Sequence, residues 1–300
     1  MSEPIPVNAD FLRAMPLPEP DSGGGKEERG RVLVIGGSRE LPGAVLLAGT
    51  GALRAGAGKL QMGTSESIGL HLGLSVPESM VAALPETASG SVAAEAADRI
   101  IELASRCRAL LVGPGLAVDD DTARLTRLVL EGLDGPAIVL DAAAMMRIRE
   151  DRQGLARHAG RLIITPHSGE MAGILGLDQD EIEADPAGTA LRAASDLGII
   201  VVLKGSCSHI ATPEGRIWSC AHGNVGLATS GSGDTLAGFM AGLLARGAEP
   251  AQAAIWSVFL HGEAGNRLAR SLGPLGFLAR EILDEIPWIM GDLGRVTWGG

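Results

Sequence analysis

Residues 224–234 read NVGLATSGSGD, and the apolar run TLAGFMAGLL follows directly over residues 235–244. Small residues therefore crowd the segment just before a helical pattern begins, and the carboxylate of Asp234 stands at the junction. Glycines let backbone N–H groups turn toward a phosphate, and a helix start adds positive potential. Because like charges repel, an acid there is better suited to take a proton from an attacking hydroxyl than to bind phosphate. The alternative is an N-cap aspartate that opens an ordinary buried helix, and this segment alone favours neither interpretation.

Around this segment, short apolar runs alternate with helical patterns. Strands that alternate with helices predict a mostly parallel sheet with helices on both faces, which is the α/β class. We expect one α/β domain over residues 31–300, preceded by an extended proline- and glycine-rich arm over residues 1–30. The expected strands are residues 32–35, 59–62, 109–112, 137–141, 162–165 and 199–204, with a hairpin at 208–211 and 216–218, and the expected helices are 43–55, 94–105, 122–130, 185–198 and most of the chain from 235 onward.

The composition excludes several classes of function. A formal charge of −11 argues against a nucleic acid or an anionic membrane as partner. The three cysteines are widely spaced and form no CxxC pair, so we expect neither a disulfide framework nor a zinc site, and a reducing cytoplasm is the default compartment. We expect no signal peptide, because the first 20 residues lack a basic segment followed by an apolar core, and no membrane span, because no run of 18 apolar residues occurs.

Polar or glycine-rich residues follow five of the expected strands, at residues 36–38, 113–115, 141, 165–170 and 204–208. In an open parallel sheet, ligands bind outside the carboxyl ends of the strands. We therefore expect these five segments to meet at one edge of the sheet and to line a ligand site.

Single side chains in these segments allow two interpretations each. We interpret His167 as a hydrogen-bond partner of a substrate rather than a loop histidine capped by backbone. Lys204 is suited to a nucleotide phosphate or is a solvated strand end, and Asp141 holds a magnesium-bound water or stabilises its own turn. For Glu170 we favour a role at the start of the following helix, and for His261 a place in the core.

Seven motifs, taken together and in order, resemble the ADP- or ATP-dependent NAD(P)H-hydrate dehydratases, a metabolite-repair branch of the ribokinase-like fold. The similarity runs from about residue 30 to residue 269. It implies a three-layer α/β/α sandwich with a mostly parallel sheet. The motifs are residues 36–38 with 43–44, then 52–58, 112–116, 165–170, 203–205, 228–234 and 260–262.

The resemblance also implies a reaction. An enzyme of this family would dehydrate the S epimer of NAD(P)H hydrate to NADH or NADPH, and would convert ADP or ATP to AMP or ADP and phosphate. Mg²⁺ would be the cofactor, and ADP is the nucleotide that we expect. The chain has no room for the epimerase domain that is fused to some members, so a separate epimerase would supply the S epimer. The family further suggests a cytoplasmic homo-oligomer, and we expect a tetramer.

By motif position, the resemblance assigns roles to particular residues. Asp234 would be the base that activates the substrate hydroxyl, while the N–H groups of residues 231–234 would hold the transferred phosphoryl group. The positions that match the family's contacts with the hydrated cofactor are Ala44, Gly115, His167 and Asp234. Those assigned to the nucleotide are Lys204, Gly205, Ser206, Cys207, Ser208, Gly231, Ser232 and Gly233.

Three positions depart from the family's pattern. Ala143 replaces an acid that usually follows Asp141 at a distance of two residues, which weakens the case for strong magnesium binding. Ser208 stands where threonine is common, and Ser168 where proline is common. Two other functions stay open: a small-molecule kinase of the same fold, of the hydroxymethylpyrimidine or hydroxyethylthiazole type, and a non-catalytic nucleotide-binding regulator.

Overall fold

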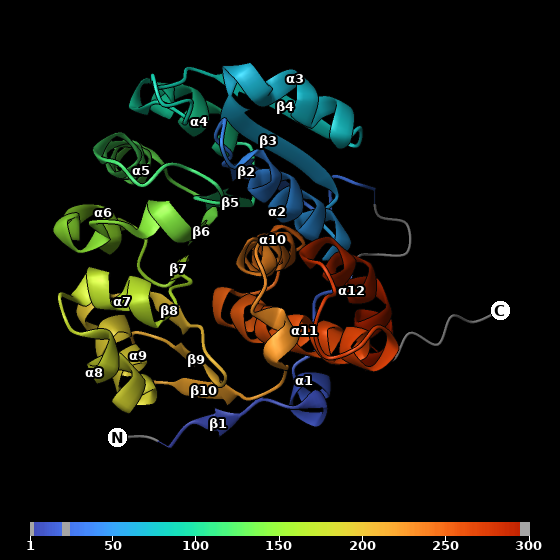
Figure 1. Cartoon of the computed structure of the whole chain (residues 1–300). Helices are drawn as coiled ribbons and strands as arrows, with labels where there is room; N and C mark the ends of the chain where they lie inside the picture. The colour runs from blue at the N-terminus through green and yellow to red at the C-terminus, as the bar shows by residue number, and fades with distance from the viewer. Residues whose placement is uncertain (1–2, 20–24, 295–300) are drawn as a thin grey trace.

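One sheet of ten strands runs through the residues that the computed structural model describes, 3–19 and 25–294 (Figure 1). Strands β2 to β8 are parallel, whereas β9 runs antiparallel to both β8 and β10, and β1 lies parallel to β10 at the edge. The order across the sheet is β1-β10-β9-β8-β7-β6-β5-β2-β3-β4. The strands are β1 Ile5–Pro6, β2 Arg31–Ile35, β3 Lys59–Ser65, β4 Ser79–Leu84, β5 Ala109–Val112, β6 Ala137–Leu140, β7 Leu162–Ile164, β8 Ile200–Leu203, β9 Ser208–Ala211 and β10 Ile217–Cys220.

Helices cover both faces of the sheet, so the expected three-layer α/β/α sandwich is confirmed (Figure 1). Successive side chains of a strand point to opposite faces, and in β2 this sends Val32 and Val34 into one hydrophobic cluster and Leu33 and Ile35 into the other. No helix within residues 3–19 and 25–294 is long and apolar enough to cross a membrane. One layer contains α2 Pro42–Arg54, α10 Ser232–Ala245, α11 Pro250–Ser271 and α12 Ala279–Leu293, and the other contains α4 Ala97–Ala104, α5 Asp120–Gly132, α6 Arg152–Arg157, α7 Ser168–Leu175, α8 Gln179–Ala184 and α9 Pro186–Leu197.

The N-terminal segment differs from the extended arm that we expected. Strand β1 joins the edge of the sheet, and the short helix α1, Ala9–Ala14, buries Leu12 completely. The indole Nε1 of Trp256 donates a hydrogen bond of 2.9 Å to the carbonyl of Met15. Residues 5–15 are therefore part of the folded domain, held by tertiary contacts that the proline-rich composition does not reveal. The rest of the expected arm lies partly outside the described residues.

Helices α2 and α10 pack closely because glycines face α2. A Cβ atom on Gly238 would lie 2.2 Å from the carbonyl oxygen of Ala48, and one on Gly242 would lie 2.3 Å from that of Ala52. Backbone atoms cannot yield as a flexible side chain can. The two glycines therefore allow the middle of α10 to lie directly against α2.

We expect the Gly238→Ala variant to lose about 1–3 kcal/mol of unfolding free energy, the usual cost of overpacking a core. The added methyl group has to push α10 away from Ala48. Urea unfolding of the purified protein measures the loss. The matched control is Gly291→Ala in α12, where a Cβ would meet no atom within 4 Å, and equal stability of the two variants would contradict the packing argument.

Candidate active site

Three side chains from three neighbouring strands meet at the carboxyl edge of the sheet. Asp141 follows β6, Thr165 follows β7 and Lys204 follows β8, and these strands lie side by side. The hydroxyl of Thr165 donates to Oδ1 of Asp141 at 2.6 Å, and Nζ of Lys204 lies 3.2 Å from the same oxygen. Asp141 is 2% exposed and Thr165 is 1% exposed. The ammonium group of Lys204 thus rests on a buried, hydrogen-bonded carboxylate.

Glu170 is the second acidic partner of Lys204, with its Oε2 3.7 Å from Nζ. The same oxygen accepts the backbone N–H of His167 at 2.8 Å, and Nδ1 of His167 accepts the N–H groups of Gly169 and Glu170 at 3.1 and 3.2 Å. These bonds form a capping box at the start of α7. The predicted helix-start role of Glu170 is therefore confirmed. Because Nδ1 accepts, a neutral His167 ring carries its proton on Nε2 and could donate it to a ligand.

The loop before α10 places Asp234 in the first turn of the helix. Gly231, with a φ of 87°, is the N-cap residue and makes no side-chain capping bond. Asp234 is thus not an N-cap, and that interpretation of the segment is wrong. The first N–H groups of a helix have no intrahelical partner. Here the N–H of Ser232 donates to the carbonyl of Thr229 at 3.2 Å, which leaves the N–H groups of Gly233 and Asp234 to meet an anion.

The charges around Asp234 and Lys204 shift their pKa values. Burial, followed by the charge of Asp141, raises the pKa of Asp234 to about 7, although Lys204 opposes the shift. Burial lowers the pKa of the Lys204 ammonium group, but the carboxylates of Asp141 and Glu170 outweigh it and hold that pKa above its ordinary value. Asp234 can therefore take up and release a proton near neutral pH, while Lys204 stays charged.

Lys204 also faces the helix start directly. A Cβ atom on Gly233 would lie 3.6 Å from Nζ of Lys204 and would meet no other atom within 4 Å. The backbone N–H of Lys204 donates to the carbonyl of Pro166 at 2.8 Å, which ties the strand end to the His167 loop. Gly205 and Ser206 are exposed beside Lys204, whereas Cys207 and Ser208 are half-buried. Two of the sequence-predicted nucleotide positions, Lys204 and Gly233, thus lie together.

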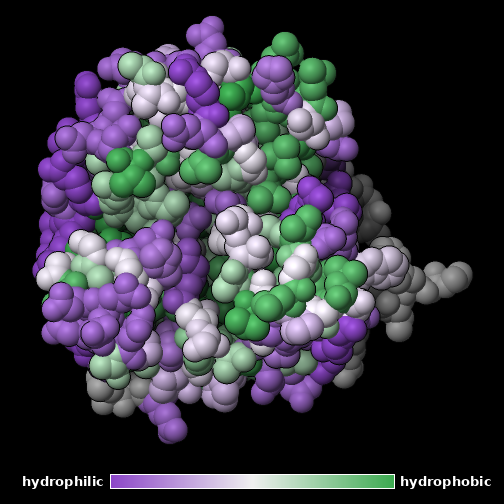
Figure 2. Space-filling model, viewed as in Figure 1, coloured by the Kyte–Doolittle hydropathy of each residue, from purple (hydrophilic) through white to green (hydrophobic). Residues whose placement is uncertain are grey.

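The predicted cofactor contacts Ala44 and Gly115 lie side by side. Gly115 has a φ of 72°, and a Cβ atom there would lie 2.8 Å from the Cβ of Ala44. The same helix, α2, carries Leu47, whose Cδ1 would lie 2.5 Å from a Cβ on Gly231. Helix α2 therefore links the Gly115 turn to the loop before α10. Figure 2 shows a hollow on this face of the molecule, between the α7–α8 region and the segment that precedes α10.

Two residues of this region were missed by sequence reasoning. His261, which we placed in the core, shares a hydrogen bond of 2.8 Å with the hydroxyl of Ser232, and burial lowers its pKa to about 4, so the ring is neutral. Thr165 was noted only as part of a polar segment. Its position next to Asp141 in the parallel register of β6 and β7, where Leu140 pairs with Ile164, is the signal that could have identified it.

The donor set does not form a magnesium site of protein ligands alone. Over residues 3–19 and 25–294, no group of three or more His, Cys, Asp or Glu side chains is arranged to hold a metal ion. Asp141 and Glu170 both contact Lys204, and Ala143 is buried in the core with 3% exposure. Mg²⁺ is commonly held by one or two carboxylates together with substrate phosphates. These residues fit only that shared arrangement.

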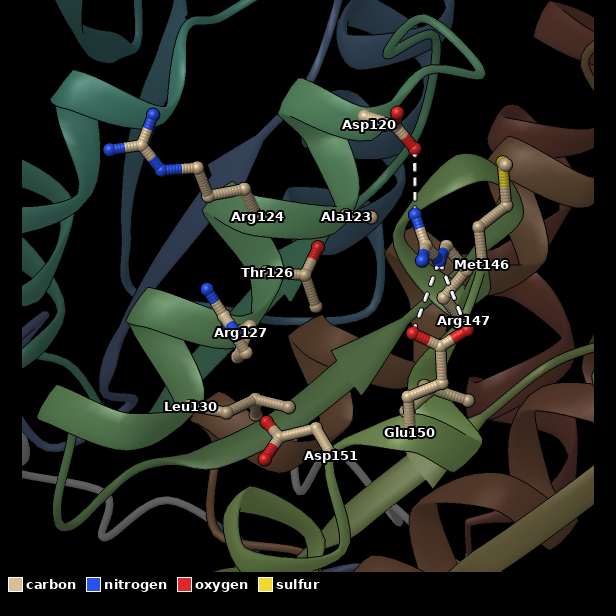
Figure 3. Close-up of a pocket in the computed structure, with 11 residues that line it drawn as sticks. Asp120, Ala123, Arg124, Thr126, Arg127, Leu130, Met146, Arg147, Glu150 and Asp151 are labelled. Carbon is tan, nitrogen blue, oxygen red and sulfur yellow. Dashed lines mark hydrogen bonds and ion pairs between the residues drawn. The ribbon is translucent and has the colours of Figure 1, made fainter.

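A separate pocket lies between α5 and residues 146–151 and contains none of the predicted site residues (Figure 3). The guanidinium of Arg147 crosses it and bonds to Asp120 at 2.7 Å and Glu150 at 3.0 Å. The charges of this pocket therefore largely satisfy one another, and the strand-end site is the better candidate for chemistry.

Comparison with known proteins identifies a family for this chain. The family model described as NAD(P)H-hydrate dehydratase matches residues 32–288. An ADP-dependent (S)-NAD(P)H-hydrate dehydratase of Xanthomonas campestris is 46% identical over 292 residues, which cover 96% of this chain and 97% of that protein. A bifunctional NAD(P)H-hydrate repair enzyme of Moorella thermoacetica is 38% identical, and the chain spans 52% of its length.

Solved structures indicate the same family. The ADP/ATP-dependent NAD(P)H-hydrate dehydratase of Bacillus subtilis, co-crystallised with ATP/Mg²⁺, superposes with a TM-score of 0.84 at 32% identity, covering 98% of this chain and 100% of that one. A hydroxyethylthiazole kinase of Pyrococcus horikoshii shares only the fold, with a TM-score of 0.57 at 18% identity. The sequence, the fold and the solved relatives thus agree, and this chain belongs to the NAD(P)H-hydrate dehydratase family.

Proposed function

We propose that this protein dehydrates the S epimer of NAD(P)H hydrate to NADH or NADPH, with ADP or ATP converted to AMP or ADP and phosphate. The observation that carries the proposal is the carboxylate of Asp234 in the first turn of α10, with the ammonium of Lys204 facing the same turn. Membership of the family supports it, as does the full-length similarity to a relative that bears this activity in its name. ADP is the nucleotide that this relative's name indicates.

The reaction needs a better leaving group than hydroxide. Asp234 takes the proton of the substrate hydroxyl as its oxygen attacks the terminal phosphorus of the nucleotide, and the bond to the nucleotide's bridging oxygen breaks. The N–H groups of residues 231–234 stabilise the charge on the phosphoryl group in transit. Phosphate then leaves the ring carbon as the ring nitrogen donates its electron pair, and loss of a proton from the neighbouring carbon completes the double bond.

The remaining site residues would bind and orient the two substrates. Ala44, Gly115 and His167 would contact the hydrated cofactor, and Lys204 to Ser208 the adenine nucleotide. The phosphates of the nucleotide, with Asp141 or Glu170 nearby, would hold Mg²⁺, which would supply positive charge to offset that of the phosphates. The local charge supports this, because Asp141, Glu170 and Asp234 surround a single ammonium group, so a phosphate needs an added cation.

We further infer a homo-oligomer, a tetramer, that works in the cytoplasm. The three cysteines are all free, which suits a reducing compartment. Size-exclusion chromatography with light scattering tests the assembly, and a monomeric mass would contradict it.

The direct test is to mix hydrated NADH, ADP or ATP, and Mg²⁺ with the protein. A dehydratase restores the NADH absorbance band only when nucleotide is present. Binding of nucleotide without return of the NADH band would indicate a non-catalytic nucleotide-binding regulator. Phosphorylation of a different alcohol would indicate a kinase.

We expect turnover to rise with pH through about 7, because the pKa of Asp234 is raised to about 7 and only the ionised carboxylate accepts a proton. An aspartate with an ordinary pKa of 3.8 would already be ionised throughout the neutral range. The measurement is turnover at saturating ADP from about pH 5 to pH 9. A flat profile over that range would show that the titrating base is absent.

We expect Gly233→Ala to raise the KM for ADP by roughly tenfold while the fold stays intact, since a misfitting group in a binding site typically costs 1–3 kcal/mol. The added methyl group would stand in front of Nζ of Lys204, 3.6 Å away, and clash with nothing. Steady-state kinetics with varied ADP measures the effect. Gly173→Ala in α7, where a Cβ meets no atom within 4 Å, is the control. An unchanged KM for Gly233→Ala would show that the nucleotide phosphate does not bind at this turn.

A further inference from the structure

We propose that Thr165 is a positioning residue for the nucleotide: its hydroxyl fixes the carboxylate of Asp141, and Asp141 in turn holds the ammonium of Lys204 at the start of α10. The inference rests on the proposed function, because it takes Lys204 to be a nucleotide ligand. Thr165 itself is 1% exposed, so it acts through its neighbours and does not touch the ligand.

Two bonds converge on one oxygen atom. Oδ1 of Asp141 accepts the hydroxyl of Thr165 at 2.6 Å and lies 3.2 Å from Nζ of Lys204. The hydroxyl is also 3.3 Å from the carbonyl of Leu140, but the carboxylate is the closer acceptor. Bonds to an ionised acceptor are shorter and stronger than neutral ones. The Thr165 bond therefore sets which oxygen Asp141 presents to Lys204.

Lysine needs such a support because its ammonium group sits on a flexible four-carbon stem. Here the group lies between two carboxylates, that of Asp141 at 3.2 Å and that of Glu170 at 3.7 Å. Each carboxylate is itself held, Glu170 by the backbone N–H of His167 and Asp141 by Thr165. If Asp141 were free to rotate, the ammonium group would lose its nearer carboxylate partner and would no longer be fixed 3.6 Å from the Cβ position of Gly233. Thr165 thus keeps the charge where a phosphate at the helix start would meet it.

The test is a pair of substitutions at position 165. Thr165→Val keeps the shape of the side chain and removes the hydroxyl, whereas Thr165→Ser keeps the hydroxyl. We expect Thr165→Val to raise both the KM and the calorimetric Kd for ADP with Mg²⁺ by about fivefold, within the usual range for coupled neighbours, with kcat changed by less than about twofold. Thr165→Ser should restore wild-type binding. A merely structural threonine would lower the thermal stability of the valine variant and leave the Kd for ADP unchanged.

A double-mutant cycle with Lys204→Met shows whether Thr165 acts through Lys204. If it does, Thr165→Val has no further effect on the Kd for ADP once the ammonium group is gone. An equal loss of affinity in the Lys204→Met background, or wild-type affinity of Thr165→Val, would overturn the inference. Because calorimetry needs no turnover, a wild-type protein that binds ADP but does not restore NADH would refute the proposed function and still decide this inference.

Discussion

Replacing Asp234 by asparagine is expected to slow turnover by roughly 10²–10⁴-fold, the scale for loss of a general base, with the affinity for ADP little changed. The amide fills the same space but cannot take the proton of the substrate hydroxyl. The free N–H groups at the start of α10 stay in place, so nucleotide binding survives. Rates of NADH return under saturating ADP, together with calorimetric ADP binding, measure the two effects separately.

The same variant should be more stable than the wild type above neutral pH. The pKa of Asp234 is raised from 3.8 to about 7 in the folded protein, so its ionisation opposes folding. That cost accumulates as pH rises from about 4 to about 7 and persists above it. Asparagine has no such cost, so we expect a higher Tm for the variant at about pH 8 and no such gain below about pH 4. A gain in Tm together with a loss of turnover excludes misfolding as the cause.

The control is Asp121→Asn, which places the same change in the first turn of α5, outside the site. Its carboxylate accepts the N–H of Ala94 at 2.9 Å, a bond that an amide oxygen can replace. Turnover should stay at the wild-type level. Turnover of the Asp234→Asn protein within about twofold of wild type would place the base on another residue.

Most of the sheet could be predicted from the sequence because a strand covered on both faces is apolar throughout. The runs at 32–35, 109–112 and 137–140 fit this rule, and the structure makes strands of all of them. Elements at the edge of the sheet were not predicted. Met80 of β4 is 44% exposed, and on α3, Glu66–Ser75, Leu70 and Leu74 are each 74% exposed. Strand β4 contains an apolar run, residues 80–84, but two of its five residues are alanine, which is a weak strand former. Helix α3 contains Gly69 and Gly73 and shows no clear helical period.

The general place of the site followed from topology, because parallel strands bring their carboxyl ends to one edge. The chemistry of the site could not be predicted in the same way. The bond between Thr165 and Asp141 depends on the pairing of β6 with β7. The bond between Ser232 and His261 depends on how the consecutive helices α10 and α11 pack, and it joins residues 29 positions apart. The raised pKa of Asp234 depends on burial and on a charge 93 positions earlier, that of Asp141. A local pattern contains none of these relations.

Lys204→Met should be the second most damaging change, with the KM for ADP raised by roughly 10–100-fold, the range for a lost hydrogen bond to a charged group. Methionine keeps most of the stem but leaves Asp141 and Glu170 without the ammonium group that contacts both. The phosphate then faces both carboxylates without the ammonium group between them. Lys204→Arg keeps the charge and is expected to recover part of the affinity, which separates the loss of charge from the loss of shape.

The same substitution makes a prediction about chemistry as well as binding. The charge of Lys204 lowers the pKa of Asp234, against the larger effects of burial and of Asp141. Its removal should therefore move the acidic limb of the turnover profile to higher pH, so that the variant loses most activity below pH 7 and recovers part of it in alkaline buffer. Profiles of kcat at saturating ADP for the wild type, Lys204→Met and Lys204→Arg decide the matter. An acidic limb that does not move in the methionine variant would mean that Lys204 and Asp234 do not share one electrostatic site, even if ADP binding is lost.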